Sequence, residues 1–344
     1  MSIQSDYTVG LSKETTYGTY VAPTRFLEAD ATLKEAVETA QGTGMRPGKR
    51  VARANRRAIV KRVSEGEITL DATTRGLGYL LAAFFGSSTN TETAPDSGVF
   101  QQVHTLAKHD FGPSYTVQQG IPRLGSSTTD AFTYLGAQCS TLSLEAAADA
   151  IVTLTSGWVA RELTLEQTYA APSYPAEYDL FTFVSGGIHV GGDAFTAPTA
   201  TTPASAGAAL ATVRSASVAL DNGLDDNGWN LGNGGRRSRP AAVTGGKDDA
   251  VTGSFEVEYT GRDFVDAYRD QAELSLILEF QGPAEIATGE YPLLQIAVPT
   301  LYLDGDLPVG NGGDVITVSH DWTGLQGTDP EPVYAVYRSL DTTY

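Results

Sequence analysis

The chain has 344 residues, of which 41% are hydrophobic, and a formal net charge of −18. Its one cysteine, Cys139, excludes a disulfide framework, and its 37 glycines are typical of strands joined by many turns. The longest apolar run, Leu77–Phe85, is too short to span a bilayer, and Met1–Asp6 has no signal-peptide pattern. We therefore expect a mainly β protein that is made and assembled in a cytoplasm.

The charge is unevenly spread along the chain. Between residues 46 and 62 there are eight cations and no acid: Arg46, Lys49, Arg50, Arg53, Arg56, Arg57, Lys61 and Arg62. Without them the remainder has 15 cations against 41 acids, a net charge of −26. An acidic body repels nucleic acid, whereas a basic segment attached to it is suited to bind the acidic body of another copy.

Two segments near the start of the chain are candidates for contacts. Residues 1–33 hold tyrosines and glycines but no clean alternation before residue 24, which fits an arm packed on a surface or an ordinary first strand with a loose tail. Residues 39–64 hold the basic loop. This loop fits a docking element for acidic neighbours, a DNA contact, or a solvated loop that only aids solubility.

A strand and then a helix are predicted between residues 65 and 86. Residues 65–71 form the strand, and the apolar residues between Leu77 and Phe85 recur at helical spacing. We expect Thr73 or Thr74 to cap this helix and Gly86 to end it. Its apolar face would then pack on the sheet as a flanking helix.

The clearest strand pattern is residues 142–158, LSLEAAADAIVTLTSGW. Apolar residues alternate with polar ones on both sides of a short turn, which predicts a half-buried antiparallel hairpin. The opening pattern of apolar residue, any residue, Leu and acid recurs at 68–71, 218–221 and 301–304, with the Leu positions 74, 76 and 83 residues apart. We interpret this as a repeated hairpin with loops of different length, although such short matches also arise by chance.

The remaining chain gives further strands, one short helix and several loops. Residues 87–98 are predicted to be a polar loop, residues 196–209 an exposed Ala/Thr/Pro linker, and residues 222–249 a long Gly/Asp/Asn loop. A helix is expected over 262–270. Because the repeat continues across the linker, we expect a single domain over residues 1–344. Strands are expected within 101–125 and at 274–280, 293–303 and 333–337.

Patterns typical of catalysis or metal binding are missing from the sequence. The four histidines are His104, His109, His189 and His320, and none has a partner at metal-ligand spacing. Cys139 has no nearby histidine, and residues 221–228 fail the calcium-loop pattern because Gly223 occupies the third position. We therefore expect no enzyme activity, no metal and no cofactor.

Four stretches together resemble the phage tail tube proteins, the major tail proteins of long-tailed phages. The stretches lie at residues 7–23, 66–81, 134–144 with the strand that follows, and 216–224. The resemblance implies a β-sandwich or barrel-like core with one flanking helix and long inter-subunit loops. It also implies homo-hexameric rings stacked into a hollow tube, through which genomic DNA passes into the host.

The same resemblance implies the partners and the location of the protein. The partners would be further copies of the chain and other tail proteins, such as the tape measure, tail terminator and baseplate. Genomic DNA would pass through the lumen without sequence-specific binding, and no membrane contact is implied. The protein would lie in the virion tail after assembly in the host cytoplasm. The basic loop would then contact an adjacent subunit or ring.

Polar strand faces are the candidates for the wall of the tube's lumen. The alternating strands offer three pairs of residues: Glu65 and Glu67, Thr153 and Thr155, and Glu256 and Glu258. Acid on this face would keep DNA from adhering. The alternative function is a capsid decoration or adhesin-like β protein, which would be a stable monomer or trimer with exposed aromatic residues at its loop tips.

Overall fold

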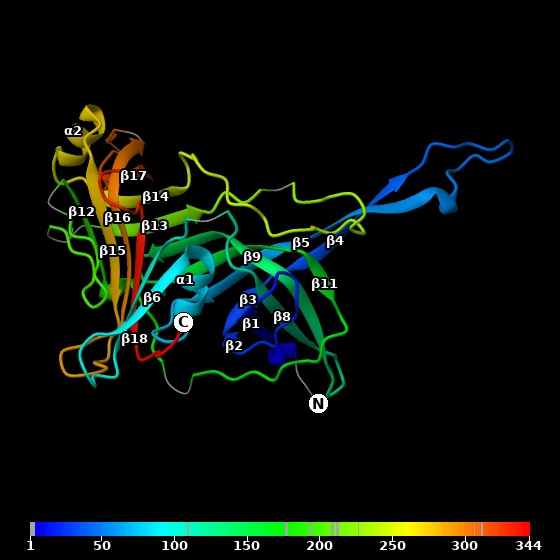
Figure 1. Ribbon diagram of the computed structural model, residues 1–344. Helices are drawn as coiled ribbons and strands as arrows, with labels where there is room; N and C mark the ends of the chain where they lie inside the picture. Colours follow the sequence, from blue (N-terminus) through cyan, green and yellow to red (C-terminus); the bar gives the residue numbers. More distant parts are fainter. Residues whose placement is uncertain are drawn as a thin grey trace.

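The computed structural model describes residues 4–108, 110–175, 178–192, 195–207, 210, 213–225, 227–305, 307–310 and 312–344. In these residues the chain is mainly β, as the sequence predicts, with antiparallel strands and two α-helices (Figure 1). The helices are α1 (Gly78–Phe85) and α2 (Asp263–Asp270). The strands are β1 (Thr8–Lys13), β2 (Arg25–Leu27), β3 (Ala29–Ala31), β4 (Lys34–Gln41), β5 (Arg57–Asp71), β6 (Gly86–Glu92), β7 (Phe100–Leu106), β8 (Tyr115–Pro122), β9 (Thr129–Ala147), β10 (Thr153–Ala160), β11 (Glu162–Thr164), β12 (Gly186–Gly191), β13 (Val213–Asp221), β14 (Val251–Glu258), β15 (Leu274–Gln281), β16 (Leu293–Gly305), β17 (Thr317–Gly324) and β18 (Tyr334–Ser339).

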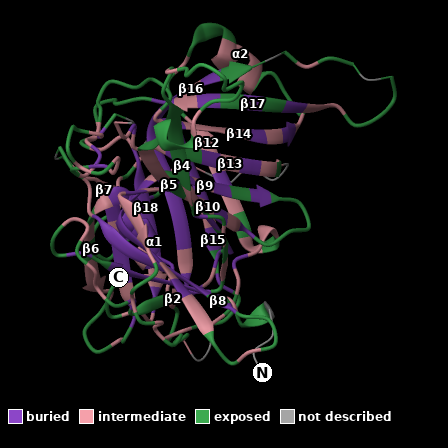
Figure 2. Ribbon diagram, turned by 90° about the vertical axis from the view of Figure 1, so that its right-hand side faces the viewer, coloured by how far each residue is buried: buried purple, intermediate pink, exposed green. Residues whose placement is uncertain are grey.

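The strands form one connected antiparallel network that folds back on itself around a core. The first layer runs β3/β4–β5–β10–β9–β13–β14–β17–β16, and Figure 2 shows several of these strands side by side. The opposite side is built from β12–β15–β16–β18–β7–β6 and from β2–β1–β8–β9–β11. The long strands β9 and β16 belong to both sides, which gives a sandwich-like fold.

The core lies against the inner face of the first layer. The three predicted hairpins, β9–β10, β13–β14 and β16–β17, are all confirmed, and each sends its alternating apolar residues inward. Leu144, Leu154, Val218, Phe255 and Trp322 are all nearly fully buried. Burial of each such side chain contributes about 1.5–3 kcal/mol, so this period-two pattern fixes which face of the layer points outward.

The first helix is shorter than expected at its start. Leu77, not Thr73 or Thr74, is its N-cap residue, and no side chain caps it. Thr74 instead pairs with Asp179: the Thr74 amide donates to the Asp179 carbonyl, and the Asp179 amide donates to the Thr74 hydroxyl. These bonds hold Thr74 in the extended segment that precedes the helix. Gly86 ends the helix in the left-handed conformation (φ 74°), as predicted.

The second helix, α2, confirms the expectation for residues 262–270. Phe264, Ala267 and Tyr268 pack against the core, while Asp263 and Asp266 face solvent in the first turn. Carboxylates at this end of a helix are stabilised by its macrodipole.

Two segments without a clear strand pattern in the sequence are strands. Residues Thr8–Lys13 form β1, which is paired with β2 on one side and β8 on the other, so for this part the structure agrees with the ordinary first strand and not with the arm. Five consecutive residues of β1 are buried, because both of its faces are covered, and no alternation remains to be seen in the sequence. Residues 87–98, expected to be a loop, begin with β6, an edge strand of mostly small polar residues.

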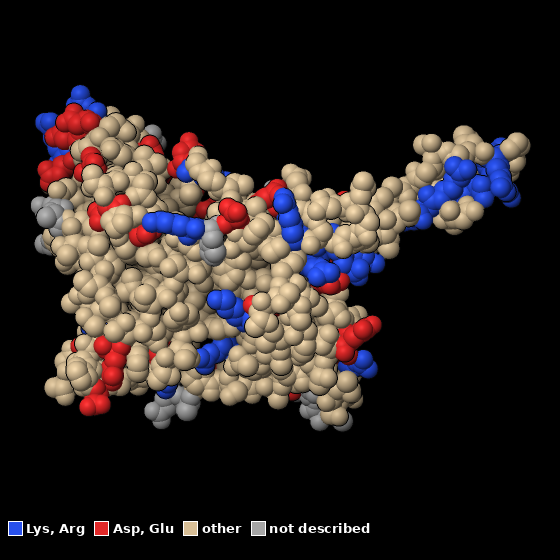
Figure 3. All heavy atoms as spheres, viewed as in Figure 1, with Lys and Arg blue, Asp and Glu red and all other residues tan. Residues whose placement is uncertain are grey.

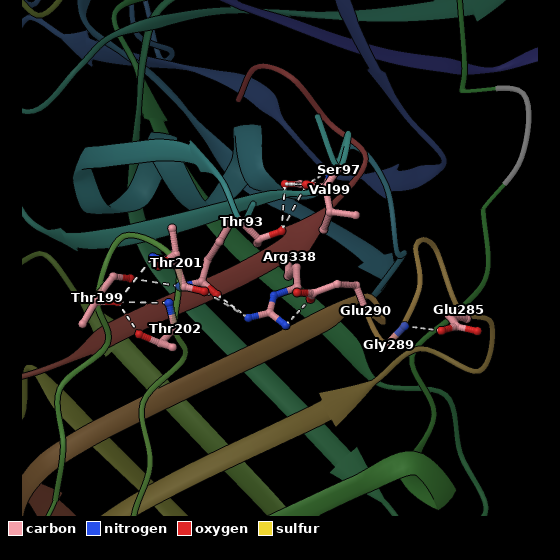
Figure 4. Close-up of polar contacts among 11 residues, drawn as sticks. Thr93, Ser97, Val99, Thr199, Thr201, Thr202, Glu285, Gly289, Glu290 and Arg338 are labelled. Carbon is pink, nitrogen blue, oxygen red and sulfur yellow. Dashed lines mark hydrogen bonds and ion pairs between the residues drawn. The ribbon is translucent and has the colours of Figure 1, made fainter. Parts of the chain in front are cut away.

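The Ala/Thr/Pro segment is a strap across the sheet rather than an exposed linker. In its described part, residues 195–207, the backbone of Ala204 exchanges two hydrogen bonds with the Gln295 side chain, at 2.9 and 3.0 Å. Arg338 donates to the Thr201 carbonyl at 3.3 Å and forms an ion pair with Glu290 at 2.6 Å (Figure 4). The small side chains of the strap let it lie close on strands β15, β16 and β18.

Candidate assembly surfaces

The most prominent surface feature is a hairpin that projects from the body (Figure 1). β4 pairs with the first part of β5, from Lys34 opposite Glu65 to Gln41 opposite Arg57. Residues 42–56 close the hairpin, and nearly all of them are exposed. The basic loop predicted at residues 39–64 is therefore the tip of a two-stranded ribbon together with the second strand of that ribbon.

The eight cations of this loop fall into two groups. Six lie on the distal part, and none of them forms an ion pair with the residues that the structure describes; Figure 3 shows their blue cluster away from the body. Lys61 and Arg62 lie at the base instead, where Arg62 pairs with Glu35 at 2.7 Å and the Lys61 ammonium sits 3.8 Å from the centre of the Trp229 ring. The distal group, here called the tip cations, is Arg46, Lys49, Arg50, Arg53, Arg56 and Arg57.

Apolar side chains on the hairpin are also exposed. Met45, next to Arg46, is 89% exposed, and Val51, between Arg50 and Arg53, is 81% exposed. Val37, Ile59 and Val60 are about half exposed. A two-stranded hairpin is marginally stable in water when it has no apolar face to bury. The combination of unpaired charge and exposed apolar surface is therefore typical of an element that is completed by a partner.

The base of the hairpin is held by the long loop at residues 222–249. The Trp229 indole donates to the Arg62 carbonyl at 3.2 Å, and the Arg62 amide donates to the Gly235 carbonyl at 2.7 Å. Arg237 is 2% exposed, and its guanidinium carbon lies 4.6 Å from the centre of the Trp229 ring. The described part of this loop thus braces its own chain's hairpin, and sequence reasoning missed Trp229 because a lone tryptophan in a glycine-rich loop carries no pattern.

The second surface is the outer face of the first layer. The strand registers place all six predicted lumen candidates on it. On β5, Glu65, Glu67, Thr69 and Asp71 all lie on the exposed side. Thr69 is opposite Thr155 of β10, and Asp71 is opposite Thr153. From Thr153 a row of opposed residues crosses the neighbouring strands: Glu145 on β9, Ser217 on β13 and Ser254 on β14. Glu256 and Glu258 follow Ser254 on the same face of β14.

This outer face is polar and acidic. Its side chains are mainly Ser, Thr, Asp and Glu, and Glu258 is paired with Arg214 at 2.8 Å. Asp304 and Asp321 lie directly opposite each other on β16 and β17. Like charges in this position destabilise a sheet, so the charge of this face, here called the acidic face, is not explained by the stability of the isolated chain.

Groups suited to catalysis are not assembled in the described parts of the chain. No three His, Cys, Asp or Glu side chains among those residues come together as a metal site, and none of the described helices is long and apolar enough to cross a membrane. His104 is fully buried and burial lowers its pKa to about 3; burial raises the pKa of the Cys139 thiol. His109 lies outside the described residues. The titratable groups with the largest pKa shifts are thus core residues rather than a reactive cluster.

Comparison with known proteins identifies the family. A family model described as phage tail tube protein matches residues 4–324. A comparison with curated proteins found no match. Because the family match covers nearly the whole chain, including both assembly surfaces, the protein belongs to the phage tail tube protein family.

Proposed function

We propose that copies of this chain form closed rings that stack into the hollow tube of a phage tail, through which genomic DNA passes into the host. The family resemblance implies a homo-hexameric ring. The observation that carries the proposal is the acidic face, which extends without interruption across the strands from β5 to β16.

In this proposal the acidic face lines the lumen. Carboxylates there repel DNA phosphates, and short hydroxyl side chains offer few groups that would hold a base or phosphate. Glu65, Glu67, Thr153, Thr155, Glu256 and Glu258 are the proposed lumen residues. DNA would therefore slide through the tube without sequence-specific binding.

The projecting hairpin is proposed to contact an adjacent subunit or ring. Its tip cations have no carboxylate partner in their own chain among the described residues, while the rest of the chain is strongly acidic. Met45 and Val51 would be buried in the same contact. The contact would be partly electrostatic, so tube growth is expected to weaken as salt rises.

The role proposed is structural, with no catalytic step and no cofactor. The partners are other copies of the chain and other tail proteins, such as the tape measure, tail terminator and baseplate. The location is the virion tail, after assembly in the host cytoplasm. The alternative, a capsid decoration or adhesin-like protein, is favoured by no specific feature of the two surfaces.

Electron microscopy of the purified full-length chain tests the proposal. We expect rings with a central lumen, or filaments of stacked rings, at high protein concentration or with a tail-initiating partner. A compact monomer or trimer that has no lumen and never polymerises would contradict the proposal and support the alternative function.

A further inference from the structure

We infer that the chain contains two tandem copies of one four-stranded ring unit, so that a ring with six parts closes with three chains rather than six. The inference rests on the proposed function, because it concerns the ring from which the tube would be built. It changes the subunit number that the family resemblance implies and names the strand edges that meet between chains.

The first layer divides into two sets of strands with the same arrangement. The first set is β3/β4, β5, β10 and β9, and the second is β13, β14, β17 and β16, each given in spatial order. In both sets the first two strands are followed in the chain by a helix, α1 or α2. In both sets a hairpin follows, β9–β10 in the first and β16–β17 in the second. The second strand of each hairpin, β10 or β17, pairs with the strand that precedes the helix, β5 or β14.

The two sets also agree residue by residue. One row of opposed residues in the first set is Ala29, Leu70, Leu154 and Leu144. The same row in the second set is Val218, Gly253, Trp322 and Leu303. Leu144 therefore corresponds to Leu303, and Ala29 corresponds to Val218.

A joint between the two sets already exists inside the chain. β9, the last strand of the first set in space, pairs with β13, the first strand of the second set, with Leu144 opposite Val218. If the two sets are equivalent, β16 should pair in the same way with β3 of another copy. Repeating this joint closes a ring and pairs both end strands of the first layer, β3 and β16.

Both edges required for the second joint are open. In the part of the chain that the structure describes, β3 pairs only with β5, and residues 302–305 of β16 pair only with β17. The outward carbonyls are covered by single side chains: the Tyr7 hydroxyl donates to Ala31 at 3.2 Å, and the Gln271 amide donates to Leu303 at 3.3 Å. Either side chain could be displaced by an incoming strand.

The internal joint predicts the register between chains. Leu303 should lie opposite Ala29 of the next copy, and Tyr302 opposite Asp30, which is the counterpart of Ser143 opposite Ala219. Leu274 of β15 already pairs with Leu301 of β16, so only the residues of β16 after Leu301 are open to another chain. The joint between chains therefore contains fewer residue pairs than the internal joint. The projecting hairpin beside β3 would supply further contact area.

Paired cysteines test both the register and the number of chains. Asp30 is exposed and Tyr302 half-buried on the outer face. The Leu303 carbonyl points away from β17 toward Gln271, and the Ala31 carbonyl points away from β5 toward Tyr7, so the backbone groups of Tyr302 and Asp30 point toward β17 and β5. Across the joint these two residues therefore form a close, non-hydrogen-bonded pair. Their Cα atoms should be about 4.5 Å apart, a distance that a disulfide can span. The full-length double variant Asp30→Cys/Tyr302→Cys is assembled, oxidised and run on a denaturing gel without reductant. Native Cys139 is buried, which keeps it out of the reaction.

Two matched variants calibrate the experiment. Ser143→Cys/Ala219→Cys places the same pair at the internal joint and should give a link within one chain. Asp30→Cys/Asp304→Cys is out of register by two residues and should link poorly. Native mass spectrometry or imaging of unmodified rings gives the number of chains without any substitution.

The inference predicts intermolecular links whose ladder ends at three chains, and unmodified rings with the mass and symmetry of three chains. A ladder that continues to six, rings containing six chains, or equal linking of the out-of-register pair would overturn it while leaving the proposed function intact. If the unmodified protein forms no rings at all, the proposed function itself fails, and this inference fails with it.

Discussion

Single buried polar residues set how the isolated chain responds to pH. His104 is on β7, opposite Ser88 of β6, and its Nδ1 atom is 2.6 Å from the Ser88 hydroxyl. Burial lowers the pKa of His104 to about 3. The unfolded chain has a histidine pKa near 6.5. Below pH 6.5 the unfolded chain therefore binds a proton that the folded chain refuses, so stability is complete above this pH and falls as the pH drops toward 3.

The substitution His104→Gln tests this assignment. Unfolding of the unassembled chain should cost about 2 kcal/mol less at pH 5 than at pH 6.5 in the native protein, through His104 alone. The variant should be less stable at neutral pH but should lose this part of the pH dependence. Denaturant titrations at several pH values measure both quantities, and an unchanged slope between pH 6.5 and 5 would assign the acid sensitivity elsewhere.

Arg338 is expected to hold the strap in place (Figure 4). Its guanidinium contacts Glu290, Gln101 and the Thr201 carbonyl, and its side chain is 15% exposed. Arg338→Ala should destabilise the chain by about 1–3 kcal/mol because it leaves these acceptors unpaired. Hydrogen exchange should become faster in residues 195–207 before it changes in the core strands.

The matched control is Arg262→Ala, which removes an exposed pair with Asp266 on α2. Surface pairs of this kind contribute about 0–1 kcal/mol, so little change is expected. Equal effects of the two substitutions, or normal exchange of the strap in Arg338→Ala, would show that the packing of small residues alone holds the strap.

At the scale of elements, the projecting hairpin is the part whose function depends most on charge. Replacing Arg53, Arg56 and Arg57 with Glu should stop tube growth but leave the monomer folded, because these side chains form no ion pairs in their own chain among the described residues. Reversal of three charges should weaken each contact by about 3 kcal/mol, roughly a hundredfold in affinity. Sedimentation and electron microscopy measure the loss, and circular dichroism checks the fold.

Replacement of the same three arginines with Lys is the control, since it keeps the charge. Tubes should still form, although with fewer bidentate contacts. Normal polymerisation of the Glu variant would reject the hairpin as a charged contact between subunits.

The elements that the sequence could predict are those with one covered face. The hairpin β9–β10 alternates clearly because its outer side meets solvent, and α2 shows its apolar stripe for the same reason. The sequence left β1 open between an arm and a first strand, because a strand covered on both faces shows no alternation. β6 was missed because an edge strand of small polar residues resembles a loop. The strap was missed because Ala, Thr and Pro are common both in linkers and in segments that pack closely on a sheet.

The repeated Leu-acid pattern shows a further limit of the sequence. Residues 142–145 and 301–304 do occupy equivalent strands, but residues 68–71 and 218–221 occupy other positions in their sets. They share the pattern because β5, β9, β13 and β16 each place Leu in the core and an acid on the outer face. The true duplication is visible only when the strand order and registers are known.

At the scale of the whole molecule, the two surfaces divide the charge of the chain. The tip cations are held away from the body (Figures 1 and 3). The acidic face extends over the layer that the open edges of β3 and β16 would join to other copies. The sequence singled out the tip cations and six residues of the acidic face. It also counted Lys61 and Arg62, which lie at the base of the hairpin, and it missed Asp304 and Asp321. The spatial relation of the two surfaces could not be predicted, because it depends on pairings between strands far apart in the chain.

A reconstruction of the assembled tube by electron cryomicroscopy tests the central claim most directly. The account predicts that the lumen wall is a continuous sheet whose inward side chains include Glu67, Thr155 and Glu256, with the hairpin in a contact between subunits. A lumen lined mainly by Lys and Arg, or an acidic face turned to the outside of the tube, would contradict it.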